Sequence, residues 1–64
     1  MLSKKFQQRV YNAYKQDPYA EVKHGNFTYA IAYNSCANIH TWIIRKGIND
    51  NTFHWLQPLD VNIK

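Results

Sequence analysis

The chain has 64 residues, a net charge of +4 and ten aromatic side chains, and its only cysteine is Cys36. A chain of this length fits one small domain, residues 1–64, whose core is marginal because only about 60% of the unfolded surface is buried at that size. The single cysteine excludes an intrachain disulfide and fits a reducing, cytoplasmic setting, and no run approaches the roughly 18 apolar residues that a membrane span needs.

Residues 3–16 are predicted to form a helix. Ser3 can cap the N-terminus with its hydroxyl group, and Asp17-Pro18 is expected to end the helix because the residue before proline avoids the helical region. Apolar residues recur at intervals of three and four residues, which is the period of a single helix face. This apolar stripe consists of Phe6, Val10, Ala13 and Tyr14.

The other side of the predicted helix is basic. Residues 1–16 contain four cations and no acid, and the cations are Lys4, Lys5, Arg9 and Lys15. Tyr11 lies between the lysines in the sequence and is expected to face solvent. Lys4 and Lys5 occupy the first turn, where the helix dipole disfavours cations by about 0.3–1 kcal/mol each. Folding does not require that placement, which is either a tolerated feature without a role or a mild cost kept for binding.

Two strands are expected next. Residues 19–24 form a short strand candidate, and His24-Gly25-Asn26-Phe27 has the composition of a tight turn. Residues 27–34 alternate between large and small side chains, which is typical of a strand with two different faces. The large ones are Phe27, Tyr29, Ile31 and Tyr33, and the small ones are Thr28, Ala30, Ala32 and Asn34.

Residues 34–47 are compatible with two structures. Ser35 as an N-cap and Gly47 just past the end would suit a helix, whereas the β-branched and aromatic residues from Ile39 to Ile44 favour a strand. We favour the strand because it pairs naturally with the alternating strand before it. Asn49-Asp50-Asn51 is then a turn, residues 52–57 form a last strand, and Pro58 closes it.

The expected fold class is α+β, with one N-terminal helix packed on a small antiparallel meander of three or four strands. The alternative is that residues 35–47 form a second helix. One helix covers only one face of such a sheet, so the other face is expected to carry aromatic side chains that a partner covers. The candidate protein interface consists of Tyr29, Tyr33, Trp42, Phe53 and Trp55.

The leading functional hypothesis is a non-catalytic module that binds nucleic acid or a nucleoprotein through the basic helix face. Lysine and arginine neutralise phosphates, and a tyrosine can stack on an unpaired base. The competing interpretation is an ordinary solvated helix face. The candidate nucleic-acid-binding residues are Lys4, Lys5, Arg9, Tyr11, Lys15, Arg45 and Lys46.

The alternative function is a protein-binding inhibitor or adaptor that docks through the aromatic sheet face onto an acidic protein surface, or as a homodimer. The size, the basic charge and the Asn-, Lys-, Ile- and Tyr-rich composition resemble those of small accessory proteins of phages and mobile elements as a loose class. That resemblance rests on composition and on no motif. It assigns no site residues.

Enzymatic activity is not expected. A small metal-independent ribonuclease is the most serious catalytic alternative, because it needs only an acid, a base and a cation, which His24, His40, His54 and Arg45 could supply. Cys36 and His40 lack the paired spacing of a zinc site, and phosphate-loop and dinucleotide motifs are absent. We therefore expect no metal, no cofactor, no membrane partner and no small-molecule substrate.

Overall fold

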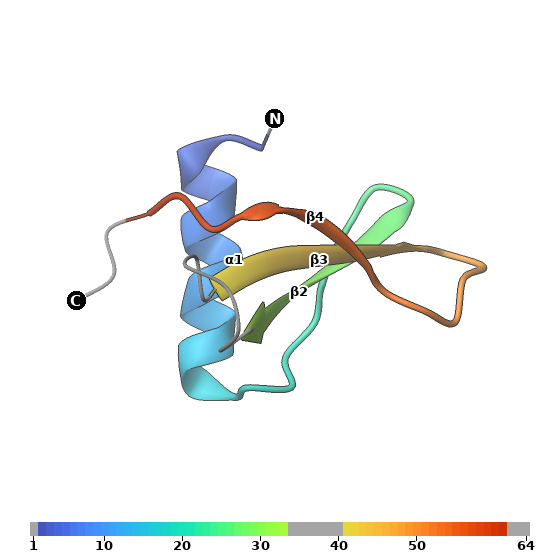
Figure 1. The fold of residues 1–64 in the computed structure, drawn as a ribbon, viewed down its shortest axis with the longest axis horizontal. Helices are drawn as coiled ribbons and strands as arrows, with labels where there is room; N and C mark the ends of the chain where they lie inside the picture. Colours follow the sequence, from blue (N-terminus) through green and yellow to red (C-terminus); the bar gives the residue numbers. More distant parts are fainter. Residues whose placement is uncertain (1, 34–40, 62–64) are drawn as a thin grey trace.

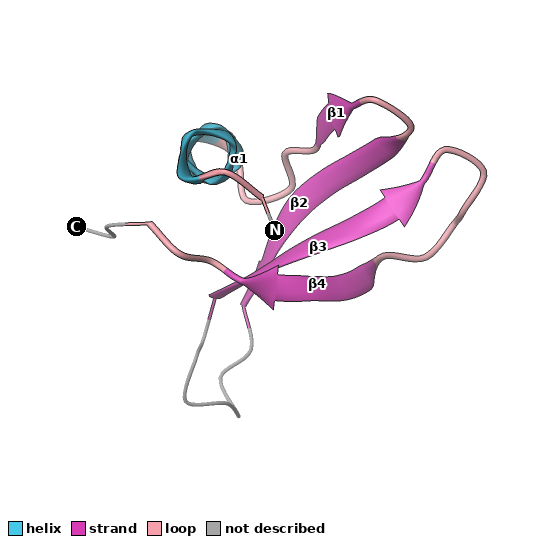
Figure 2. Cartoon of the chain, turned by 90° about the horizontal axis from the view of Figure 1, so that it is seen from above, coloured by secondary structure: helices cyan, strands magenta, loops and turns pink. Residues whose placement is uncertain are grey.

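A computed structural model of the chain describes residues 2–33 and 41–61. It contains one helix, α1 (Lys4–Gln16), and four strands, β1 (Val22–His24), β2 (Phe27–Tyr33), β3 (Thr41–Gly47) and β4 (His54–Pro58). The strands form one antiparallel sheet in the order β1-β2-β3-β4, with α1 on one side of it (Figures 1 and 2). The predicted α+β fold is confirmed. The second-helix alternative is wrong for residues 41–47, and residues 35–40 lie outside the described part of the chain.

The ends of α1 follow the predicted signals. The hydroxyl oxygen of Ser3 accepts a hydrogen bond from the Phe6 amide at 3.1 Å, which caps the helix. Asp17 leaves the helical region, and its carboxylate accepts a hydrogen bond from the Tyr19 amide at 3.0 Å. This local turn occupies the first half of the predicted strand 19–24, so β1 begins only at Val22.

The core lies between α1 and the face of β2 that carries the large side chains. Its centre consists of Val10, Tyr29, Ile31 and Ile43, and Ile43 is 0% exposed. Phe6 of the helix meets Tyr29 edge-on, with ring centroids 4.9 Å apart. The helix therefore covers the face of β2 that carries the large side chains, and the small side chains lie on the other face.

Gln7 is one of the two buried residues of α1 that the predicted apolar stripe missed, and Tyr11 is the other. The Gln7 side chain is 1% exposed, and its amide nitrogen donates to the Leu2 carbonyl at 3.0 Å. Its amide oxygen accepts a hydrogen bond from the Asp60 amide at 2.8 Å. A polar residue can thus occupy the core-facing side of α1 because both ends of its amide are paired. In this way Gln7 ties the segment before α1 and the segment after β4 to the helix.

Replacing Gln7 by methionine is expected to lower the free energy of unfolding by about 1–3 kcal/mol. Methionine has a similar shape, but it cannot pair with the Leu2 carbonyl or the Asp60 amide. Leaving such groups without a hydrogen-bond partner costs about 1–3 kcal/mol of stability. Urea denaturation followed by circular dichroism measures the change. The control is Gln8→Met, because Gln8 makes only an exposed side-chain contact with Asn12 and its replacement is expected to stay within about 0.5 kcal/mol. Equal midpoints for the two variants would contradict a stabilising role for the Gln7 hydrogen bonds.

Two turns set the pairing of the strands. A two-residue turn, Gly25-Asn26, joins β1 to β2. Gly25 has a φ of 63°, a backbone conformation that favours glycine at this position of the turn. Between β3 and β4, the Asp50 carboxylate accepts a hydrogen bond from the Gly47 amide at 3.2 Å, and the Asp50 amide donates to the Gly47 carbonyl at 3.1 Å. The turn predicted at residues 49–51 thus begins at Gly47.

The pairing of β3 with β4 contains a bulge that matters for the side chains of β4. Ile43 pairs with Gln57 and Ile44 pairs with Trp55, so Leu56 is an extra residue between them. A bulge lets two consecutive residues project to similar sides of the sheet. Leu56 packs against the core, and the Gln57 side-chain oxygen accepts a hydrogen bond from the Leu2 amide at 3.4 Å. Trp55 is left on the side of the sheet away from α1.

Candidate functional site

The described residues carry two candidate surfaces, on opposite sides of the molecule. The first is the solvent side of α1, called here the basic helix face, and it consists of the exposed residues Lys4, Lys5, Arg9 and Lys15. The second is the sheet face away from α1. Because α1 lies on one side of the sheet (Figure 2), these surfaces point in different directions. A single flat ligand cannot contact both surfaces at once.

Tyr11 does not belong to the basic helix face. The expectation that it faces solvent is wrong, because its side chain is only 9% exposed. It stands four residues after Gln7 and three before Tyr14, so it lies on the inner side of the helix rather than opposite the apolar stripe. Its ring stacks on Tyr14 at 6.1 Å, and the Lys15 ammonium lies 5.4 Å from the ring centroid. Tyr11 in this position cannot offer an open face to a nucleic-acid base.

Arg45 and Lys46 do not extend the basic helix face together. They are neighbours on β3, so their side chains project to opposite faces of the sheet. Arg45 pairs with Tyr29 and lies on the α1 side, with its guanidinium carbon 4.2 Å from the Phe27 ring centroid. Lys46 pairs with Thr28 on the opposite face. The predicted set of nucleic-acid-binding residues is therefore divided between two surfaces.

The predicted aromatic interface is also divided. Tyr29 is buried in the core beneath α1, and Tyr33 projects to the same side of the sheet from the end of β2. Trp42 and Trp55 lie on the other side, where Trp55 is paired with Ile44. The aromatic side chains on the face away from α1 come from β3 and β4 rather than from β2. The alternation in β2 explains this, because all of its large side chains point towards the helix.

We call the remaining far-side cluster the sheet platform. It consists of Trp42, Ile44, Lys46, Phe53 and Trp55. The two indole rings meet nearly at right angles, with centroids 5.7 Å apart and an interplanar angle of 76°. The Lys46 ammonium lies 5.4 Å from the Phe53 ring centroid. Trp55 is 58% exposed, and the rest of the platform is half-buried.

A row of polar side chains adjoins the sheet platform. In the strand register, Lys23 pairs with Thr28, and Thr28 pairs with Lys46, so the three residues form a line across β1, β2 and β3 on the face away from α1. We call this line the cationic row. The sequence prediction did not include Lys23. An available signal was its place one residue before the predicted His24–Phe27 turn, which puts it on the same face as Thr28.

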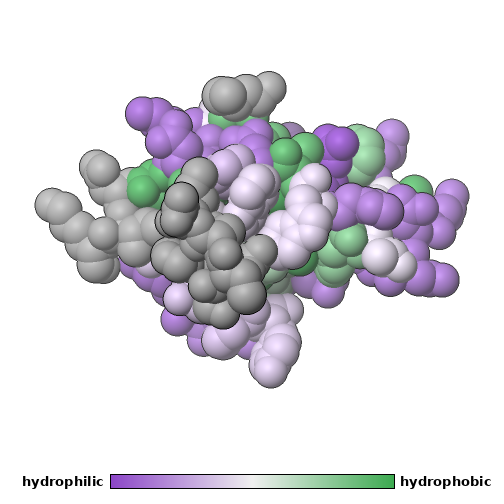
Figure 3. All heavy atoms as spheres, viewed as in Figure 1, coloured by the Kyte–Doolittle hydropathy of each residue, from purple (hydrophilic) through white to green (hydrophobic). Residues whose placement is uncertain are grey.

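The surface chemistry of this side is mixed. Figure 3 looks at the molecule from the same direction as Figure 1, in which β4 and the beginning of β3 pass in front of α1. Pale and green side chains of intermediate to high hydropathy lie between purple hydrophilic ones across the strands. The rings of Trp42, Phe53 and Trp55, together with the ammonium of Lys46, suit a ligand that has both flat apolar surfaces and negative charges.

The described histidines do not form a catalytic pair. His24 is on β1 and His54 is on β4, the two outer strands, which are about 14 Å apart at the usual interstrand spacing. The His24 ring also packs between aromatic rings, 4.8 Å from that of Phe6. His40 and Cys36 lie outside the described residues. Within 2–33 and 41–61, no three histidine, cysteine, aspartate or glutamate side chains come together as a metal site would require.

The helix α1 is too short and too polar to cross a membrane, and no other helix occurs among residues 2–33 and 41–61. A comparison of the chain with known proteins finds no matching family model, no similar characterised protein and no similar solved structure. The function is therefore inferred from the side chains of the two surfaces.

Proposed function

We propose that this protein is a non-catalytic, cytoplasmic module that binds single-stranded nucleic acid, without sequence preference, on the sheet platform. The supporting observation is the pair of indole rings, Trp42 and Trp55, 5.7 Å apart on the sheet face that also carries Lys46. Aromatic rings stack on bases of any sequence, and lysines neutralise the phosphates that join them. This combination is the one that sequence-tolerant single-strand binding needs.

A single strand suits the sheet platform better than a duplex does. The bases of a duplex stack on one another, so their faces are not available to an indole ring, whereas an unpaired base can lie on Trp55. No helix that could enter a major groove lies on this side of the described sheet. The basic helix face, on the opposite side, is the competing nucleic-acid surface and is open to a separate test.

The intrinsic fluorescence of the protein gives a direct assay, because its only two tryptophans are Trp42 and Trp55. Titration with an oligothymidylate is expected to quench the emission, with a dissociation constant of about 1–100 µM near physiological salt, as is usual for non-specific binding. Affinity should fall with salt, and a matched duplex should bind more weakly. Fluorescence unchanged by any oligonucleotide at low salt would refute the proposal.

Charge-neutral substitutions separate the sheet platform from the basic helix face. Lys46→Gln is expected to reduce the slope of log affinity against log salt by about 0.7, because one phosphate contact is lost. Lys5→Gln removes the same charge from the solvent side of α1 and is expected to leave the slope unchanged. Fluorescence titrations at four salt concentrations give both slopes. The opposite pattern would move the binding site to the basic helix face.

A protein partner is the second candidate function, and the exposure of Trp55 favours it specifically. A tryptophan that is 58% exposed beside a second indole ring is a common anchor in protein interfaces. An acidic inhibitor target or a second copy of this chain would cover the same surface. Sedimentation velocity at increasing concentration tests the homodimer. A constant monomer mass, together with salt-dependent quenching by the oligonucleotide, would favour nucleic acid.

A further inference from the structure

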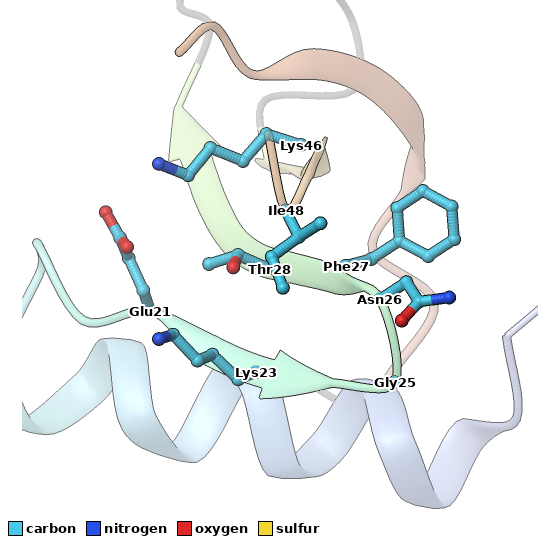
Figure 4. Close-up of a pocket in the computed structure, with 8 residues that line it drawn as sticks. All are labelled: Glu21, Lys23, Gly25, Asn26, Phe27, Thr28, Lys46 and Ile48. Carbon is cyan, nitrogen blue, oxygen red and sulfur yellow. The ribbon is translucent and has the colours of Figure 1, made fainter. Parts of the chain in front are cut away.

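A pocket of about 260 Å³ lies at the end of the sheet platform, on the side of the sheet away from α1 (Figure 4). It is formed by β1, the Gly25-Asn26 turn, the start of β2, the end of β3 and the loop after β3. The lining residues that matter here are Glu21, Lys23, Thr28 and Lys46. The pocket is thus lined by all three residues of the cationic row, Lys23, Thr28 and Lys46.

The pocket gathers charged groups at one end. Figure 4 shows the side chains of Glu21, Lys23 and Lys46 reaching towards the same end of the pocket, away from the ring of Phe27. Thr28 lies between the two lysines in the strand register and supplies a hydroxyl group. Two ammonium groups and a hydroxyl are suitable donors for the oxygens of a phosphate group.

Glu21 gives this end of the pocket an acidic group of its own. The Glu21 side chain reaches towards this end of the pocket in Figure 4. Glu21 and Lys23 are both exposed, so water screens their charges and the effect of the carboxylate is modest. A phosphate group that entered the pocket would be attracted by the two ammonium groups and repelled by this carboxylate.

We propose that this pocket binds a phosphate group of the single strand whose bases stack on the sheet platform, with Lys23 and Lys46 as its cationic groups and Glu21 as a nearby carboxylate that opposes the binding. The inference rests on the proposed function and identifies the anion-binding part of the same surface. Lys46 belongs to both the pocket and the platform, so the two are continuous.

The spacing along β3 supports this arrangement. Lys46, Ile44 and Trp42 alternate on one face of the strand, and Ile44 pairs with Trp55. Successive side chains on one face are about 7 Å apart, which is comparable to the separation of neighbouring phosphates in an extended single strand. A strand with one phosphate in the pocket therefore places its next bases over Trp55 and Trp42. It would run along β3 rather than across the sheet.

Nuclear magnetic resonance tests the pocket and the platform separately in one spectrum. In a titration with oligothymidylate, the two indole N–H signals report the platform, and the backbone amides of Lys23 and Thr28, which belong to the pocket alone, report the pocket. Shifts in both sets support the inference. Shifts of the indoles alone would overturn the pocket while leaving the proposed function standing, and no shift in either set would refute both.

The source of the phosphate is distinguished by three probes. An oligonucleotide without terminal phosphates that shifts the pocket amides indicates an internal phosphodiester. Shifts that require a 5′- or 3′-phosphorylated end indicate a terminal monoester. Tripolyphosphate, which has no bases, is expected to shift the pocket amides and leave the indoles unchanged, and its failure to shift the pocket amides would count against phosphate recognition.

Substitution of Glu21 provides the discriminating variant. Glu21→Gln is expected to tighten oligonucleotide binding roughly two- to fivefold, because it removes the opposing carboxylate, and Lys23→Gln is expected to weaken binding by a similar factor. The control is Asp60→Asn, which changes the net charge by the same amount in the segment after β4 that Gln7 holds on the α1 side. If the Glu21 and Asp60 variants tighten binding equally, only net charge matters and the pocket assignment is wrong.

Discussion

Replacing Trp55 by alanine is expected to weaken the binding of single-stranded oligonucleotides roughly five- to 150-fold. The range corresponds to the loss of about 1–3 kcal/mol that removal of one stacked aromatic ring usually costs. Trp55 is 58% exposed and near the edge of the sheet, so its truncation removes the stacking surface with little effect on the core. Fluorescence anisotropy of a labelled oligothymidylate measures the change at fixed salt.

Two control variants define what this result means. Trp55→Phe keeps a flat ring and is expected to retain most of the affinity. Tyr19→Ala removes an aromatic side chain that is 90% exposed in the turn after α1, away from the sheet platform, and is expected to change nothing. Affinity that survives Trp55→Ala, or that falls equally with Tyr19→Ala, would remove the sheet platform as the binding surface. Circular dichroism confirms that each variant is folded.

Replacing Ile43 by alanine is expected to lower the free energy of unfolding by about 2–5 kcal/mol, as is usual for truncation of a buried aliphatic side chain. Ile43 is 0% exposed and lies at the centre of the core beside Tyr29 and Ile31. A single core in so small a domain rarely supplies more than about 3–5 kcal/mol. The variant should therefore be largely unfolded at 25 °C, as circular dichroism and urea titration will show.

The neighbour of Ile43 provides the matched control. Ile44 is next in sequence and is the same residue type, but it is half-buried on the face away from α1. Ile44→Ala should cost clearly less than Ile43→Ala, and Ile43→Val should cost only about 0.5–1.5 kcal/mol. If Ile43→Ala and Ile44→Ala unfold at the same urea concentration, the core does not lie on the side of the sheet described above.

The arrangement of the two surfaces has a consequence for how such a small domain can be stable and still bind. The large side chains of β2 are used for the core under α1, and the sheet platform is built from β3 and β4. Substitutions at the exposed Trp55 can therefore change binding without opening the core. The bulge beside Ile43 contributes to this separation, because it lets Leu56 join the core while Trp55 remains on the far side.

The local features of the fold could be predicted from the sequence. Ser3 and Asp17 bound the helix because their short polar side chains pair with nearby backbone amides. Gly25 marks the first hairpin because its backbone adopts a positive φ with little strain. The alternation of large and small residues from Phe27 to Tyr33 defines a strand with two unlike faces. Each of these features depends only on interactions between residues close together in the chain.

The site required contacts between residues far apart in the chain. Helical spacing alone did not show that Gln7 is buried, because its burial depends on the carbonyl of Leu2 and the amide of Asp60. Lys23 and Lys46 lie on either side of Thr28 in one row across the sheet. This placement depends on the strand registers of two hairpins, and those registers are set by the turns and by the packing of the whole sheet.

The sequence by itself determined the N-terminal helix, the first hairpin and an aromatic surplus beyond what one helix covers, and it favoured a strand over a helix within residues 34–47 without deciding between them. Only the tertiary structure decided that this surplus is Trp42, Phe53 and Trp55, and that Tyr11 and Tyr29 are buried. The physical reason is that the spacing of residues along a helix or strand fixes which of them share a face, whereas their burial depends on which other element packs against that face.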